Sequence, residues 1–100
     1  MQVGILGATG TVGQRFAVLL ESHPCFKVAV VAASNSSRGK LLGGSWRLSS
    51  PCPAHLLNLA LALCNPECFT GCRIIFSALD EAAAVDIEQQ FVAAGTLDLI

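Results

Sequence analysis

Three regularly spaced glycines form the part of this sequence that is best suited to binding a phosphate group. Residues 7–13 read Gly-Ala-Thr-Gly-Thr-Val-Gly and stand between a short apolar run and an amphipathic segment. In a strand-turn-helix unit, such a turn brings backbone N–H groups and the positive end of a helix dipole to a pyrophosphate. Gly7 would allow the tight turn, Gly10 a close approach of backbone to ligand, and Gly13 close packing of the helix. The segment predicts a dinucleotide site, and the alternative is a glycine-rich connection without a ligand.

The residues after the second apolar run indicate which dinucleotide such a site prefers. NAD enzymes place an acidic residue there, about 20 residues after the turn, to bind the ribose 2′-hydroxyl. This sequence has no acid at that place, and Ala33 is followed by Ser34, Asn35, Ser36, Ser37, Arg38, Gly39 and Lys40. Hydroxyl, amide and basic side chains bind a 2′-phosphate, so the segment favours NADP. The alternative is an ordinary solvated loop.

Side chains that could perform catalysis are poorly placed along the sequence. A nucleophile needs an adjacent base, but His23 stands beside a proline at a helix end and His55 lies in a poorly patterned segment. We interpret both histidines as structural or solvent-exposed. Four acidic residues lie in or next to one predicted helix, and a capping role and a solvated helix face account for their positions: Asp80, Glu81, Asp86 and Glu88. We therefore predict no catalytic residue in this chain.

The cysteines favour neither a disulfide framework nor a metal site. Their number is odd and no secretion signal accompanies them, which predicts reduced thiols at Cys25, Cys52, Cys64, Cys68 and Cys72. The last three recur at every fourth residue. Zinc sites usually present closer Cys-x2-Cys pairs together with a second pair or histidines. We therefore predict structural thiols and no metal.

The composition limits the class of protein. The 100 residues suffice for one small domain. Scattered basic residues and a net charge of −1 argue against nucleic acid and against an anionic membrane as partners. No apolar run approaches the roughly 18 residues needed to span a bilayer, and without a signal peptide we expect a cytoplasmic protein. The chain is 53% hydrophobic and 13% charged, which indicates either an oligomer or, as we favour, part of a larger buried core.

The N-terminal third has the pattern of a βαβ unit. Apolar residues 2–6 and 26–33 predict two buried strands, and helical spacing predicts an amphipathic helix from Thr11 that ends before Pro24. We expect Thr11 and Gln14 to form a capping box at the helix start. The buried face of this helix is expected to hold Val12, Phe16, Leu19 and Leu20. Its polar face is expected to hold Gln14, Arg15, Glu21 and Ser22.

The remaining two thirds combine a long loop with a second strand-helix unit. Glycine- and serine-rich residues 34–50 predict a loop, with Trp46 as its anchor, and alternating leucines weakly favour a strand over 54–64. Residues 73–77 predict a strand by their β-branched and aromatic content. A helix is expected from Glu81 to about Ala94, with Asp80 as its cap, Gly95 after its end, and one face formed by Ala84, Ile87 and Phe91. Residues 96–100 are expected to begin another strand.

As a set, these residues resemble aspartate-semialdehyde dehydrogenase, and the fungal and archaeal branch of that family is the most similar. The N-terminal part of the resemblance lies in residues 3–16, Leu19-Leu20, His23-Pro24, 33–37, Gly39-Lys40 and Trp46. A later block comprises Cys64, Pro66, Phe69, Cys72, residues 75–80, Ile87-Glu88, Phe91 and Ala94-Gly95. Residues 41–63 match poorly, and Ser36 stands where that loop usually has arginine.

The resemblance implies reduction of L-aspartyl 4-phosphate with NADPH, through a thioester on a catalytic cysteine with a histidine as acid and base. Both of those residues lie downstream of the matched region. It also implies that four residues bind the diphosphate, namely Thr9, Gly10, Thr11 and Val12. Ser34 and Ser37 are implied as ligands of the 2′-phosphate, and Ser77, Ala78 and Leu79 as the lining of the cofactor groove. The predicted cofactor site consists of these diphosphate, 2′-phosphate and groove residues together with Gly7, Gly13 and Arg38.

The expected fold class is α/β, a partial Rossmann-type parallel sheet with three or four strands. Residues 1–95 would form the NAD(P)-binding domain, and residues 96–100 a truncated or divergent tail. We expect a segment that binds NADP but reduces nothing alone, and that is marginally stable or prone to aggregation because apolar faces stay uncovered. Full-length members of the family are expected to be homo-oligomers. Two alternatives are a segment of N-acetyl-glutamyl-phosphate reductase and a non-catalytic NADP sensor.

Overall fold

The computed structural model describes residues 2–33, 39–49, 51–79, 81–93 and 98–99. The strands and α-helices follow one another as β1 (Gln2–Leu6), α1 (Thr11–Glu21), β2 (Lys27–Ala33), β3 (Ala62–Leu63), β4 (Ile74–Ser77), α2 (Glu81–Ala93) and β5 (Asp98–Leu99). Short 3-10 helices occupy the connections as η2 (Leu42–Ser45), η3 (Ala54–Leu56) and η4 (Pro66–Phe69). The predicted strands at 2–6, 26–33 and 73–77 and the two predicted helices are thus confirmed.

All strand pairs in the sheet are parallel, and the strand order is β3-β2-β1-β4-β5. The chain moves outward from β1 to β3, then crosses to the other side of β1 to form β4 and β5. This order confirms the α/β, Rossmann-type prediction. The described residues form five strands instead of three or four, because the two-residue strands β3 and β5 extend the sheet at its edges.

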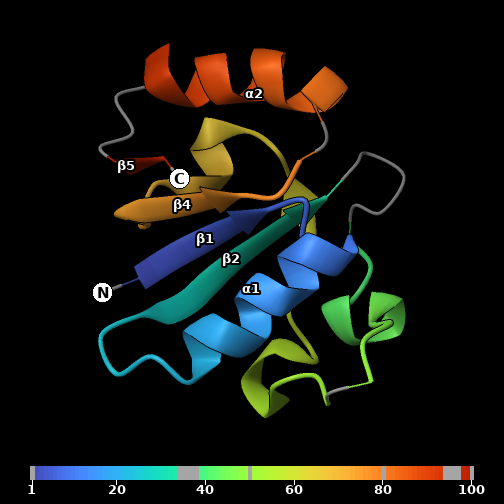
Figure 1. The fold of residues 1–100 in the computed structure, drawn as a ribbon. Coiled ribbons are helices and arrows are strands. Elements are labelled where there is room, and N and C mark those ends of the chain that lie inside the picture. The colour runs from blue at the N-terminus through green and yellow to red at the C-terminus, as the bar shows by residue number, and fades with distance from the viewer. Residues whose placement is uncertain (1, 34–38, 50, 80, 94–97, 100) are drawn as a thin grey trace.

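The two helices cover opposite faces of the sheet (Figure 1). On β1, Val3 and Ile5 belong to the core cluster on the α1 side, whereas Leu6 belongs to the cluster that contains Phe91 of α2. This alternation follows from the two-residue period of a strand. Because the central strands are buried on both faces, they are apolar throughout, and this accounts for part of the hydrophobic excess in the composition.

Phe69 closes the α2 side of the sheet during the crossover from β3 to β4. Its ring is 3% exposed and meets the ring of Phe91 edge-on, with 5.3 Å between the centroids. The ring lies directly against Gly4 of β1, where any Cβ would overlap its edge carbons. Gly4 is therefore required for the close approach of the crossover to the central strand.

The segment between β2 and β3 packs against the α1 side of the sheet. The N–H of Leu42 donates to the carbonyl oxygen of Leu59 at 2.9 Å, and Leu41 and Ala60 form an antiparallel bridge. Half-buried Trp46 packs against the core on this side, which confirms its predicted role as an anchor. The predicted strand over 54–64 is wrong except at β3, because its leucines pair with residues 39–43 and not with the sheet.

The buried face of α1 matches the predicted one only in part, since Leu20 is buried and Phe16 packs half-buried against the core. Val12 and Leu19 are 57% and 68% exposed, while Gln14 is fully buried. The residues that face the core are Gly13, Gln14, Ala17 and Leu20. Small residues at 13 and 17 let the helix approach the sheet closely, and this rotates the buried stripe away from Val12. In α2 the predicted face is confirmed, with Phe91 fully buried, whereas Asp80 and Gly95 lie outside the described residues.

Replacement of Gly4 by alanine tests the contact between the crossover and β1. We expect Gly4→Ala to lower the free energy of unfolding by about 1–3 kcal/mol, since the new methyl group must displace the Phe69 ring. Urea denaturation measures this loss. Gly44→Ala is the control, because no atom lies within 4 Å of its added Cβ and its effect should stay within about 0.5 kcal/mol. Equal losses for the two variants would contradict the packing role of Gly4.

Candidate functional site

The turn between β1 and α1 is fixed by its own backbone. Gly7 has φ of +76°, a left-handed conformation that side chains other than glycine adopt rarely. Its N–H and that of Ala8 both donate to the carbonyl oxygen of Ala32 in β2 at 2.9 Å, and the Gly10 N–H donates to the Gly7 oxygen at 3.2 Å. A Cβ on Gly7 would also lie 2.9 Å from the carbonyl oxygen of Ala78. The predicted tight turn at Gly7 is confirmed.

The N-terminus of α1 carries no side-chain cap. Gly10 is the N-cap residue, and the first bond of the helix runs from the Gln14 N–H to the Gly10 oxygen at 2.9 Å. The predicted capping box of Thr11 and Gln14 is therefore wrong, because Thr11 is the first helical residue and its hydroxyl does not cap the helix. The N–H groups of residues 11–13 have no carbonyl one turn earlier to bond to. They form, with the helix dipole, a place suited to an anion.

The three motif glycines differ in what surrounds them. A Cβ on Gly13 would overlap the carbonyl oxygen of Gly7, so α1 packs on the turn only because residue 13 has no side chain. A Cβ on Gly10 would meet only the Gly7 oxygen, at 3.6 Å, which is an ordinary contact. The predicted packing role of Gly13 is confirmed, and Gly10 is exposed beside the helix N-terminus. Of the other turn residues, Thr9 is half-buried, whereas Thr11 and Val12 are exposed.

The end of β4 lies beside this turn. Leu6 is in register with Ser77, and the Ala78 N–H donates to the Leu6 oxygen at 2.9 Å. The structure therefore brings Ser77, Ala78 and Leu79, all half-buried, next to the glycine turn. This is the point at which the strand order reverses, where open α/β sheets bind their ligands.

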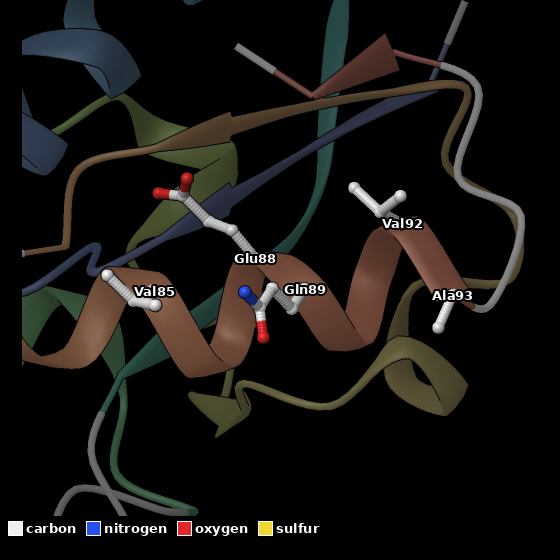
Figure 2. A pocket seen from close by; sticks show the side chains of 5 residues that line it. All are labelled: Val85, Glu88, Gln89, Val92 and Ala93. Atoms are coloured by element: carbon white, nitrogen blue, oxygen red, sulfur yellow. The ribbon is translucent and has the colours of Figure 1, made fainter.

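Glu88 of α2 contacts the same edge of the sheet. The Ser77 hydroxyl donates to Glu88 Oε2 at 2.7 Å, and Glu88 is half-buried. The prediction that Glu88 lies on a solvated helix face is therefore wrong. Figure 2 shows its carboxylate extending from α2 toward the strands. The open pocket in that view is lined by Val85, Glu88, Gln89, Val92 and Ala93. None of these residues belongs to the glycine turn.

The Cys64 thiol contacts the backbone of the turn at Gly7. Its half-buried thiol donates to the carbonyl oxygen of Ala33 at 3.5 Å. Burial raises the pKa of the Cys64 thiol, and a hydrogen bond from the Gly7 backbone lowers it by a smaller amount. The raised pKa disfavours the reactive thiolate at neutral pH. Sequence reasoning did not place this thiol near the site, because the contact arises only from the pairing of β2 with β3.

The other predicted residues are dispersed or lie beyond the described parts. Ser34, Ser37 and Arg38 are outside the described residues, attached after the carboxyl end of β2. His55 is exposed and lies 3.0 Å from the Glu21 carboxylate, and His23 is also exposed, as interpreted from the sequence. In the described ranges no group of three or more histidines, cysteines or acids is arranged to hold a metal ion. Among the same residues, no helix has the length and apolar character needed to cross a bilayer.

Comparison with known proteins agrees with this geometry. Aspartate-semialdehyde dehydrogenase of Schizosaccharomyces pombe is 47% identical over 92 residues, which cover 90% of this chain and 26% of that protein. The enzyme of the same name from Methanothermobacter thermautotrophicus is 38% identical over 93 residues, or 91% and 27% of the two chains. The chain thus spans about a quarter of the length of these relatives.

A solved structure and a family model match nearly the whole chain. The crystal structure of aspartate semialdehyde dehydrogenase with NADP from Candida albicans superimposes with a TM-score of 0.92 at 40% identity, over 97% of this chain and 28% of that one. The family model described as the NAD binding domain of semialdehyde dehydrogenase matches residues 2–99. The chain therefore belongs to the semialdehyde dehydrogenase family and corresponds to its NAD-binding domain.

Proposed function

We propose that this chain binds NADP(H) with the pyrophosphate at the N-terminus of α1. The observation that supports this most directly is the uncapped helix end, placed by Gly7 and Gly13 at the point where the strand order reverses. An anion there gains backbone N–H donors and the helix dipole without displacing a side-chain cap. Gly10 is exposed at this helix end, so a ligand can approach its backbone, and a side chain at position 10 would occupy part of that space.

We assign the contacts of the cofactor to three segments. The diphosphate is bound by Thr9, Gly10, Thr11 and Val12 of the turn. The 2′-phosphate is bound by Ser34, Ser37 and Arg38, which follow β2 without an acidic residue among them. Ser77, Ala78 and Leu79 line the groove from the β4 side. The match to a relative solved with NADP supports this choice of cofactor.

In the whole protein, we propose, this cofactor serves the reduction of L-aspartyl 4-phosphate to the semialdehyde. The names of the relatives support that activity, and this chain contributes binding groups instead of a reacting side chain. The proposed cofactor domain comprises residues 1–95, and Asp98–Leu99 of the segment expected as a truncated or divergent tail join its sheet as β5. We also propose that the whole protein is cytoplasmic and assembles into homo-oligomers. We propose no nucleic-acid or membrane partner, and the net charge of −1 supports this.

Calorimetric titration of the purified chain with NADPH and with NADH tests the proposal. We expect micromolar affinity for NADPH and weaker binding of NADH, because the basic, acid-free segment after β2 favours a 2′-phosphate. The chain alone should not oxidise NADPH in the presence of the acyl phosphate. Absence of heat with both nucleotides would contradict the proposed function, and equal affinities would contradict the assignment of Ser34, Ser37 and Arg38.

Gly10→Ser separates ligand binding from folding. The added Cβ meets only an ordinary contact in the protein, and serine is a favourable N-cap residue, so the stability should not fall. The side chain enters the space proposed for the pyrophosphate, so we expect the NADPH dissociation constant to rise about tenfold or more. Thermal unfolding and calorimetry measure the two effects. Unchanged NADPH affinity in this variant would place the pyrophosphate elsewhere.

Alkylation of Cys64 gives a second view of the site. Because burial raises the pKa of its thiol, the alkylation rate of Cys64 should keep increasing with pH past the range in which the exposed thiol of Cys25 reaches its full rate, as the thiolate fraction grows. NADPH bound at the turn that contacts Cys64 should slow the reaction, and exposed Cys25 should react at the same rate with or without NADPH. Mass spectrometry of peptides from a time course measures both rates. Equal alkylation of Cys64 with and without saturating NADPH is the contrary result.

A further inference from the structure

We infer that Gln14 is a positioning residue for the cofactor turn, an inference that rests on the proposed NADP(H) site. Its side chain is fully buried although it is polar. A buried amide is tolerated when its donors and acceptor are bonded, and is costly to leave unsatisfied. The partners of this amide therefore indicate what its position in the core stabilises.

One end of the amide holds the glycine turn. Gln14 Nε2 donates to the carbonyl oxygen of Thr9 at 2.9 Å. The N–H of the same peptide group, which belongs to Gly10, is also bonded, since it donates to the Gly7 oxygen at 3.2 Å. A planar peptide group bonded through both its oxygen and its N–H has a fixed orientation. The Thr9–Gly10 peptide is thus locked with its oxygen turned toward Gln14.

The orientation of that oxygen matters for an anion. If the Thr9–Gly10 peptide rotated, its carbonyl oxygen would compete for the place beside the α1 N-terminus and oppose a negatively charged ligand. The bond from Gln14 keeps the oxygen away and leaves the first-turn N–H groups to the ligand. Gln14 thus acts through the turn and is proposed to make no contact with the cofactor.

The other end of the amide joins the turn to the loop after η2. Gln14 Oε1 accepts from the Arg47 N–H at 2.8 Å and from the Leu48 N–H at 3.2 Å. These residues lie 33 and 34 positions away in the sequence and follow the anchoring Trp46. The loop between β2 and β3 is therefore one of the supports of the glycine turn, although none of its described residues is part of the motif.

Two substitutions separate the two ends of the amide. Gln14→Met has a similar size and removes the three bonds described above, whereas Gln14→Glu in its ionised form keeps an acceptor for Arg47 and Leu48 but has no donor for the Thr9 oxygen. The control is Leu56→Ala, which removes a fully buried side chain of η3 from the same side of the sheet and lies outside the turn. All variants are compared as the complete chain at temperatures below their unfolding transitions.

Hydrogen exchange of the backbone amides, measured by NMR without cofactor, is the first readout. We expect faster exchange in both Gln14 variants at Gly10 and at residue 14, whose N–H groups are bonded within the turn, and at residues 47–48 in Gln14→Met only. Leu56→Ala should lose stability without this local pattern. Exchange in the turn that matches the Leu56→Ala control would show that Gln14 only fills the core, and would overturn the inference.

The NADPH dissociation constant is the second readout. We expect it to rise about tenfold in Gln14→Met and to stay within about twofold of the wild type in Leu56→Ala. If the wild-type chain binds NADPH and Gln14→Met binds it equally well, the positioning role is wrong while the proposed function stands. If the wild-type chain binds no NADPH, the proposed function fails, and the positioning role fails with it.

Discussion

The contact between the first turn of α1 and the backbone of the glycine turn is the constraint on which the rest of the structure depends. The helix reaches the Gly7 carbonyl only because residue 13 has no side chain. The glycine turn is also hydrogen-bonded to Ala32 of β2 and packs against Ala78 after β4. Because β1 is the central strand, this one contact places a helix N-terminus at the middle of the edge where the parallel strands end.

Burial on both faces of the sheet explains much of the unusual composition. Phe69 and Phe91 cover one face of the sheet, and the segment with Leu42 and Leu56 covers the other together with α1. The outer sides of the helices still expose Val12, Leu19, Val85 and Val92. These exposed side chains show that the described part of the chain buries only some of its apolar residues.

The groups assembled at the sheet edge are suited to holding a ligand more than to reacting with it. They are backbone N–H groups, small side chains, and a Ser77 hydroxyl bonded to Glu88. The one thiol at this edge that faces the turn, Cys64, has a pKa raised by burial. This division agrees with membership in a family whose NAD-binding domain this chain matches over residues 2–99.

The sequence by itself determined the local elements and the identity of the turn. Strands β1, β2 and β4, both helices and the special position of Gly7 follow from short-range patterns, since each depends on residues close in the chain. Only the tertiary structure decided which face of α1 is buried, why Gln14 lies inside, and that residues 54–61 leave the sheet. Those outcomes depend on contacts between residues far apart in the sequence, from 14 positions for Gly43 with Leu57 to 33 positions for Gln14 with Arg47, which helical or strand periodicity does not encode.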